Sequence, residues 1–100
     1  MEFWIENGDL VTWLDQNRRI QEKVVTRGVV DVDFSSSLNE WLVTRPNGTV
    51  ETIGVDSQIR KRTYSQSGVS ARWNGTSLVI REVNGKSKVY NYDGFLTQTL

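Results

Sequence analysis

The sequence contains no cysteine and no histidine among its 100 residues. Disulfide bonds, thiolate nucleophiles, zinc sites built from these two residues, and catalysis by Ser–His or Cys–His pairs are therefore excluded. Apolar runs long enough to span a membrane are also absent. The N-terminus lacks the basic region and the apolar region of a signal peptide. We therefore expect a small, soluble, cytoplasmic protein that uses no metal and no other cofactor and does not bind a membrane.

The charges balance, with 12 basic and 12 acidic side chains. This balance argues against a dedicated nucleic-acid binder. The two halves differ, because residues 1–50 carry eight acids and five bases whereas residues 51–100 carry four acids and seven bases. Such a distribution is compatible with an asymmetric partner or with head-to-tail association of copies. One hundred residues suffice for one core, so we assign residues 1–100 to a single all-β domain.

Turn signals recur throughout the chain and predict its fold class. Asn-Gly and Asp-Gly pairs favour tight turns, because both residues tolerate a positive φ. Short runs rich in β-branched and aromatic residues separate these signals. The sequence therefore predicts an all-β, antiparallel up-and-down meander of about nine to ten short strands, forming a small barrel or a two-layer sandwich. The main turn signals are Asn7-Gly8, Asp15-Gln16-Asn17, Gly28, Ser35-Ser36-Ser37, Asn47-Gly48, Asp56-Ser57, Gly68, Asn74-Gly75, Asn84-Gly85 and Asp93-Gly94.

The first hairpin is expected to join residues 2–6 to residues 10–14 through a three-residue loop, Glu6–Gly8. A two-residue turn would place Glu6 opposite Asp9, and like charges in that position destabilise a strand pair. Residues 10–14 carry apolar side chains on both faces, which predicts a central strand.

The second hairpin is expected to turn at Thr26–Gly28, which places Lys23 opposite Asp31. Asp31 and Asp33 then lie on a solvated face. Paired carboxylates can bind a hard cation or hydrolyse a glycoside. Two such residues on an exposed strand are more often only solvated, so we predict no catalytic residue, no metal site and no enzymatic activity.

Three further segments are interpreted from local chemistry. The loop Val83–Gly85 is expected to place Glu82 opposite Lys86, an acid against a base. Proline at the second position predicts a turn over Arg45–Gly48. Phe95–Leu100 is either a last strand or a tail.

The segment Ser37–Leu42 permits two interpretations. Ser37 and Glu40 have the spacing of a helix capping box, which predicts a single helical turn. Trp41 and Val43 favour a strand. We interpret the segment as a serine-rich turn followed by a strand.

Basic and aromatic residues accompany each other in the C-terminal half. Arginine and aromatic side chains are enriched at the energetically important positions of protein interfaces. The chain also has four tryptophans, which is many for a small core, so one or two should be partly exposed. We predict a partner-binding surface that contains Arg60, Arg62, Tyr64, Arg72, Trp73 and Arg81.

Two short segments resemble units of known families. Ser36–Asn39, with Asn47–Val50 beyond it, resembles the Leu-Asn … Gly-x-Leu segment of cyanovirin-type lectins, which implies sugar binding. Tyr90–Thr97 is similar to one unit of the Tyr-Asp repeats of large toxin shells. Each resemblance covers less than a fifth of the chain, and we assign the chain to neither family.

These observations predict a non-enzymatic protein-binding module, such as a small inhibitor or an assembly subunit. The partner, a protein or a second copy of the chain, would meet the aromatic and basic C-terminal half or an edge strand. A glycan-binding, lectin-like domain is the alternative. A binder of single-stranded nucleic acid is the third interpretation, since bases can stack on the aromatic side chains.

Overall fold

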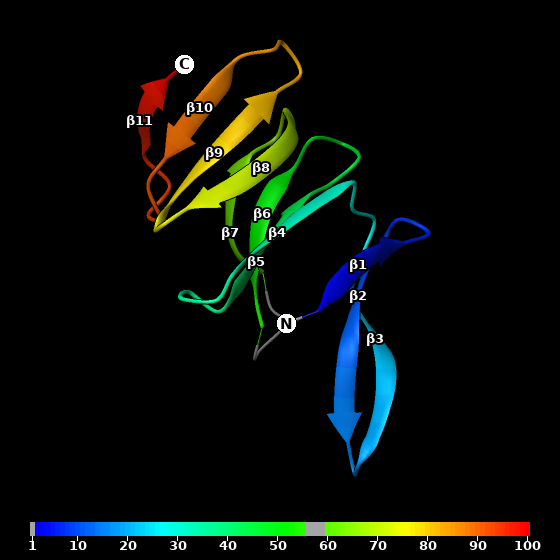
Figure 1. Ribbon diagram of the computed structural model, residues 1–100. Coiled ribbons are helices and arrows are strands. Elements are labelled where there is room, and N and C mark those ends of the chain that lie inside the picture. Colours follow the sequence, from blue (N-terminus) through cyan, green and yellow to red (C-terminus); the bar gives the residue numbers. More distant parts are fainter. Residues whose placement is uncertain (1, 56–59) are drawn as a thin grey trace.

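The computed structural model describes residues 2–55 and 60–100, except for the side chains of residues 15, 16, 60 and 61. This part of the chain forms eleven strands in three antiparallel sheets (Figure 1), which confirms the all-β, antiparallel class. The strands are β1 (Phe3–Glu6), β2 (Asp9–Gln16), β3 (Arg19–Arg27), β4 (Asp31–Ser35), β5 (Glu40–Thr44), β6 (Val50–Gly54), β7 (Arg60–Ser65), β8 (Gly68–Asn74), β9 (Ser77–Glu82), β10 (Ser87–Tyr90) and β11 (Leu96–Thr99).

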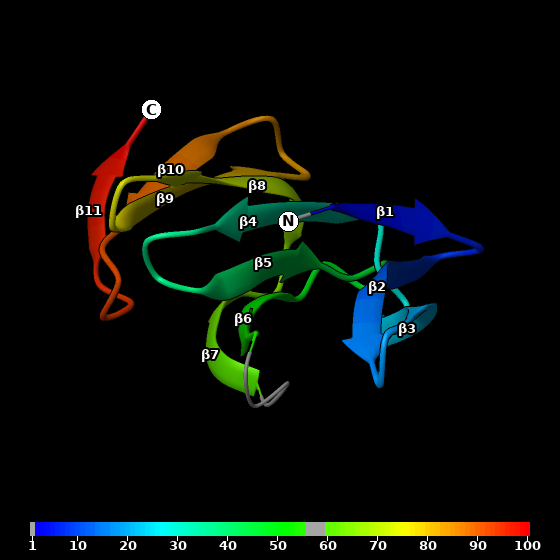
Figure 2. The same cartoon turned by 60° about the horizontal axis from the view of Figure 1, so that its bottom comes forward.

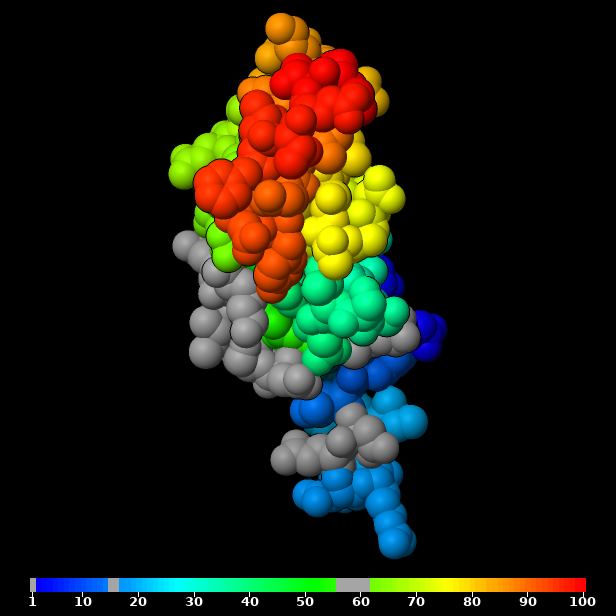
Figure 3. All heavy atoms as spheres, turned by 90° about the vertical axis from the view of Figure 1, so that its left-hand side faces the viewer, coloured from blue at the N-terminus to red at the C-terminus, as the bar shows by residue number. Residues whose placement is uncertain are grey.

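The three sheets follow one another along the chain. The first sheet has the order β1-β2-β3, the middle sheet β4-β5-β6-β7 and the third sheet β11-β10-β9-β8. The molecule is elongated, with extents of 47 × 27 × 18 Å. The distal part of the β2–β3 hairpin projects from the body as a narrow arm (Figures 1 and 3). Strands β4 and β8 lie side by side and join the middle sheet to the third sheet (Figure 2).

The predicted pairing of β3 with β4 is wrong. Strand β3 pairs with β2 over its whole length, and β4 pairs with β5 instead. The chain reverses between β2 and β3 at Asn17 and Arg18, whose φ angles are 53° and 64°. Positive φ at both central positions is the geometry of a tight hairpin turn. This turn contains no glycine and lies at the end of the polar cluster Asp15–Asn17, which marks a turn in the sequence.

The predicted three-residue loop of the first hairpin is also wrong. Glu6 lies directly opposite Asp9, and the turn between them consists of Asn7 and Gly8, with φ angles of 52° and 78°. The Asp9 carboxylate accepts a hydrogen bond from the Arg27 guanidinium at 3.1 Å. This cation from β3 offsets the repulsion between Glu6 and Asp9, so the tighter turn is tolerated.

The turns predicted at Val83–Gly85 and at Arg45–Gly48 are confirmed, whereas the turn predicted at Asn74-Gly75 lies one residue later, because Asn74 pairs with Ser77. The Glu82 amide donates to the Lys86 carbonyl at 2.8 Å, as the Val83–Gly85 loop requires. The Gly48 amide donates to the Arg45 carbonyl at 3.0 Å, which closes the proline turn. The segment Ser37–Leu42 is a turn through Asn39 followed by the start of β5, as interpreted, and β11 is a strand. The turn expected at Asp56-Ser57 lies outside the described residues.

The hydrophobic core consists of two clusters. One cluster joins the middle sheet to the third sheet, and the other joins the first sheet to the middle sheet. Strands β5 and β6 are buried along their whole length because they contribute to both. The first cluster contains Leu42, Val50, Tyr64, Ala71, Leu78 and Ile80; the second contains Leu10, Val29, Trp41, Val43 and Ile53.

The side chains of Asp31 and Asp33 connect β4 to β8, and we call this contact the β4–β8 joint. The prediction that both residues lie on a solvated face is therefore wrong. Asp33 Oδ2 accepts a hydrogen bond from the Trp73 amide at 2.8 Å. Asp31 Oδ2 accepts one from the Ala71 amide at 3.1 Å. Both carboxylates therefore satisfy backbone donors of the β8 edge, which is how a buried sheet edge is stabilised without another strand.

Candidate functional site

The residues predicted to bind a partner do not form one continuous surface. Arg72 lies on β8 and forms an ion pair with Asp31 across the β4–β8 joint. Trp73, the next residue, is half-buried and packs against the first core cluster. Arg81 on β9 is exposed. The side chain of Arg60 lies outside the described residues. A role for these residues in binding stays a prediction.

Arg62 and Tyr64 belong to a tyrosine cluster that connects β7 with the segment after β10. The Tyr64 hydroxyl donates to the Tyr92 carbonyl at 2.6 Å. The Tyr92 hydroxyl donates to Glu40 Oε2, and the Arg62 guanidinium donates to the Asp93 carbonyl and lies 5.9 Å from the centre of the Tyr92 ring. These contacts hold the sheets together, which explains both residues without a partner.

Burial and hydrogen bonding favour the neutral form of both tyrosines. Burial, the largest effect, raises the pKa of Tyr64 to about 12 from its usual value near 10. The hydrogen bond to Glu40, together with burial, raises the pKa of Tyr92. Both hydroxyl groups therefore stay protonated at neutral pH. The cluster stabilises the contact between the sheets.

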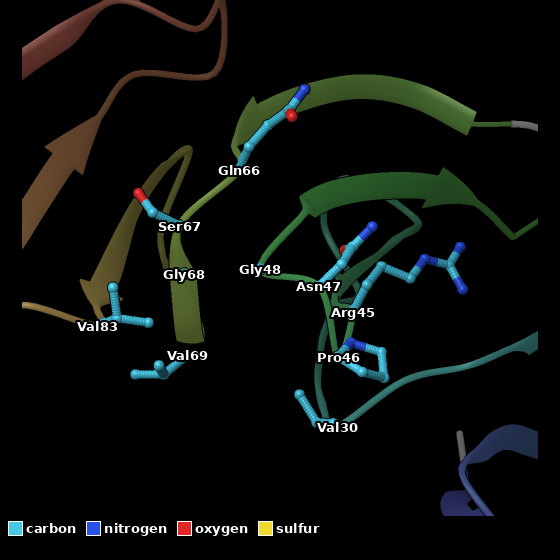
Figure 4. Close-up of a pocket in the computed structure, with 10 residues that line it drawn as sticks. All are labelled: Val30, Arg45, Pro46, Asn47, Gly48, Gln66, Ser67, Gly68, Val69 and Val83. Atoms are coloured by element: carbon cyan, nitrogen blue, oxygen red, sulfur yellow. The ribbon is translucent and has the colours of Figure 1, made fainter.

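A hollow of about 430 Å³ opens between the middle sheet and the third sheet. We call it the valine hollow, because three exposed valines line it: Val30 before β4, Val69 on β8 and Val83 after β9. Their side chains are 53%, 43% and 72% exposed. In Figure 4 they lie with Pro46 along one side of the opening, and Gln66 and Ser67 lie on the other side.

Two turns form the floor of the valine hollow and are held tightly together. The Gly68 amide donates to the Gly48 carbonyl at 2.9 Å. A Cβ atom added to Gly48 would lie 2.6 Å from the Gln66 carbonyl oxygen, which is closer than Cβ atoms approach backbone. Only glycine fits here, so the β5–β6 and β7–β8 turns give the hollow a preformed floor.

Arg45 supplies the one titratable side chain among the described residues that line the valine hollow. Its guanidinium donates to Glu51 Oε1 at 2.8 Å and to the backbone carbonyls of Arg27 and Gly28. Because these intramolecular acceptors orient the guanidinium, Arg45 fixes the first sheet to the β5–β6 turn. The hollow offers aliphatic surface rather than acid–base groups.

Sequence reasoning missed the valine hollow because its apolar residues come from three distant parts of the chain. Each of them lies near a turn signal: Val30 is two residues after Gly28, Val69 follows Gly68, and Val83 precedes Asn84-Gly85. Turns run over the protein surface, so apolar residues near them are candidates for exposure. This local signal was available in the sequence, but the convergence of the three residues was not.

Within residues 2–55 and 60–100, no group of three or more acidic side chains is arranged to hold a metal ion. The same part of the chain has no helix that is long and apolar enough to cross a membrane. A comparison with models of known protein families finds no match, and a comparison with curated protein sequences finds no match either.

Proposed function

We propose that the chain is a non-enzymatic protein-binding module and that the valine hollow receives aliphatic side chains of a partner protein. The observation that carries this proposal is the convergence of Val30, Val69 and Val83 in one preformed concave site. Exposed apolar patches with polar rims mark protein interaction sites. Fully burying a side chain of this size contributes about 1.5–3 kcal/mol. The three valines are already partly buried, so they supply part of this each and act as anchors within a larger interface.

The rim of the valine hollow suits a protein rather than a small polar substrate. Gln66 and Asn47 present amide groups at the edge of the apolar surface. Such a polar rim around an apolar centre is the usual anatomy of a protein interface. Exposed Arg81 lies two residues before Val83 in the sequence, so one of the predicted binding residues lies near the hollow along the chain.

The experiment is a pull-down with the immobilised chain and its Val83→Asp variant. Val83 is 72% exposed, so the substitution should change stability by less than about 0.5 kcal/mol. It removes an apolar contact and places a charge in the interface, which should weaken binding of the captured partner about 30-fold. Thermal unfolding of both proteins confirms that the variant is folded.

Val24→Asp is the matched control, because Val24 is also exposed but lies on β3, outside the valine hollow. Retained binding by this variant and loss of binding by Val83→Asp would support the hollow as the site. The opposite pattern would assign the partner to the first sheet and would reject the proposal.

The glycan-binding alternative keeps one supporting observation. Trp13 is exposed on β2, and its ring lies 5.0 Å from that of Trp4. A sugar ring can stack on an exposed aromatic face beside polar groups, and Lys23 and Thr12 line a shallow hollow with Trp13. Glycan binding that is abolished by Trp13→Ala and unaffected by Val83→Asp would favour this alternative.

A further inference from the structure

Strand β11 is an open edge of the third sheet. It pairs with β10 on one side, and no strand in residues 2–55 and 60–100 pairs with its other side. All four of its residues are exposed, and Figure 1 shows the strand at the outer margin of the sheet. Proteins protect such edges with charged residues, proline, short strands or bulges. Strand β11 is short and its pairing with β10 has a bulge at Thr97, but it carries no charge and no proline.

The sequence of this edge is the same in both directions. Residues 96–100 read Leu-Thr-Gln-Thr-Leu, with Gln98 at the centre. In an isologous contact the same patch is used twice, so residue i meets residue j and residue j meets residue i. Antiparallel pairing of two copies about Gln98 therefore places Leu96 opposite Leu100, Thr97 opposite Thr99, and Gln98 opposite Gln98.

The leucine and threonine pairs are favourable. Leu96 and Leu100 are 51% and 63% exposed, and pairing would cover both. Threonine pairs across antiparallel strands are also favourable. The nearest base on β10, Lys88, forms an ion pair with Glu82 at 3.1 Å, so its charge is compensated within its own chain.

The backbone directions agree with this register. The Leu100 amide donates inward to the Ser87 carbonyl at 2.7 Å. Because successive amides alternate in direction, the Thr99 amide points to the open edge. Thr97 has no Cα partner on β10, since the register steps past it, and its hydroxyl donates to the Val89 carbonyl. Thr99 thus falls at a hydrogen-bonded position of the new strand pair, and Gln98 falls at the closer, non-hydrogen-bonded position.

We propose that a second copy of this chain pairs with β11 about a two-fold axis through Gln98. The two four-stranded sheets then form one antiparallel sheet of eight strands. This inference goes beyond the proposed function, because the valine hollow includes Val69 of β8, at the opposite edge of the same sheet. A protein partner and a second copy can therefore bind at the same time.

The test is sedimentation velocity over a concentration series that extends to about 1 mM, since an interface of one short strand is small and binds weakly. The chain should sediment as a monomer–dimer equilibrium. Gln98→Lys and Gln98→Glu each place like charges directly opposite one another on the axis, which should raise the dimer Kd on the order of tenfold. An equimolar mixture of the two variants should restore association, because lysine then faces glutamate.

Gln21→Lys is the matched control, because Gln21 is an exposed glutamine on the open edge of β3. This variant should dimerise like the wild type. A monomeric wild type at about 1 mM would overturn the proposal, since even weak pairs associate at that concentration. Failure of the mixture to associate would overturn it too, and so would dissociation caused by Gln21→Lys. Assemblies larger than a dimer would instead indicate head-to-tail association.

A second readout fixes the position of the axis. The chain has no cysteine, so Gln98→Cys introduces a single thiol. At a non-hydrogen-bonded antiparallel pair the Cα atoms are about 4.5 Å apart, within the range that a disulfide bridges. Mild oxidation should yield a covalent dimer with Gln98→Cys and none with Gln21→Cys. Equal cross-linking of the two variants would show random collision and would contradict the two-fold pairing.

Discussion

Tyr64 and Tyr92 connect strands of different sheets through their hydroxyl groups, and this makes stability dependent on alkaline pH. In the unfolded chain a tyrosine loses its proton near pH 10. Burial raises the pKa of Tyr64 to about 12 in the folded protein. The stabilisation is therefore fully present below about pH 10 and is lost as the pH rises through about 12, because the unfolded state releases the proton first.

We predict that the free energy of unfolding falls more steeply between about pH 10 and about pH 12 in the wild type than in Tyr64→Phe. Urea unfolding of both proteins at several pH values in this range measures the difference. Tyr64→Phe should be less stable at neutral pH by about 1 kcal/mol, since it loses one hydrogen bond. Parallel pH profiles of the two proteins would show that Tyr64 does not cause the alkaline loss.

At the scale of the strand and turn, Gly48 and Gly75 allow a matched comparison. Both have positive φ angles, 94° and 64°, but only Gly48 faces a backbone oxygen at 2.6 Å from the position of an added Cβ. Around Gly75 no atom lies within 4 Å of that position. Replacing Gly75 by alanine therefore tests the cost of the backbone conformation alone. Replacing Gly48 by alanine tests that cost together with the cost of close packing.

We predict that Gly75→Ala lowers the free energy of unfolding by about 1–2 kcal/mol, the cost of a left-handed alanine. Gly48→Ala should lower it by about 2–5 kcal/mol, because overpacking against the β7–β8 turn adds to the strain. Chemical denaturation of the two variants gives both numbers. Equal losses would mean that the two turns can move apart without cost.

Glycine and proline predicted some turns correctly, and others, at Asn7-Gly8 and Thr26–Gly28, with the wrong loop length or the wrong strand pair. Gly48 after Pro46, and Gly85 after Asn84, were placed correctly because few other residues adopt a positive φ. The polar cluster Asp15–Asn17 indicated a turn, but not that Asn17 and Arg18 are its two central residues, with φ angles of 53° and 64°. The wrong neighbour of β3 came from the hairpin expected at Thr26–Gly28, because Gly28 there leads into a connection between two sheets. Local chemistry thus determines turns, whereas strand pairing depends on all turns together.

The candidate site was less predictable than the fold. Arg72 and Trp73 were expected to contact a partner, but Asp31 and Asp33 engage them from 41 and 40 residues away in sequence. Period-two alternation does show which side chains share a strand face. It does not show which distant strand that face will meet. The valine hollow likewise forms from residues that are distant in the sequence, so only the three-dimensional structure shows it.

At the scale of the whole molecule, the projecting β2–β3 arm should open independently of the body. The first sheet contributes to the second core cluster through Phe3, Leu10 and Val25. Among the described residues, none from the distal part of the arm belongs to either cluster, and Ile20 there is exposed. Segments with few buried contacts open with small free energies. Amides of the arm should therefore exchange faster than those of β5 and β6.

We predict that Arg18→Gly slows amide exchange in the distal arm about two- to fivefold, because glycine accepts the positive φ of this turn at little cost. Exchange in β5 and β6 should be unchanged, since those amides require global unfolding. Hydrogen–deuterium exchange followed by NMR resolves both regions. Slower exchange throughout the protein would show that the arm and the body unfold as one unit.

The joint between β4 and β8 also sets the register of these two strands. Its two acceptors, on Asp31 and Asp33, are spaced by two residues, and so are its two donors, the amides of Ala71 and Trp73. A slip by two residues would keep one of the two bonds, and a slip by one would keep neither, because alternate amides face β9. Both hydrogen bonds form in only one register. The two carboxylates therefore fix the alignment of β4 with β8, which belong to different sheets.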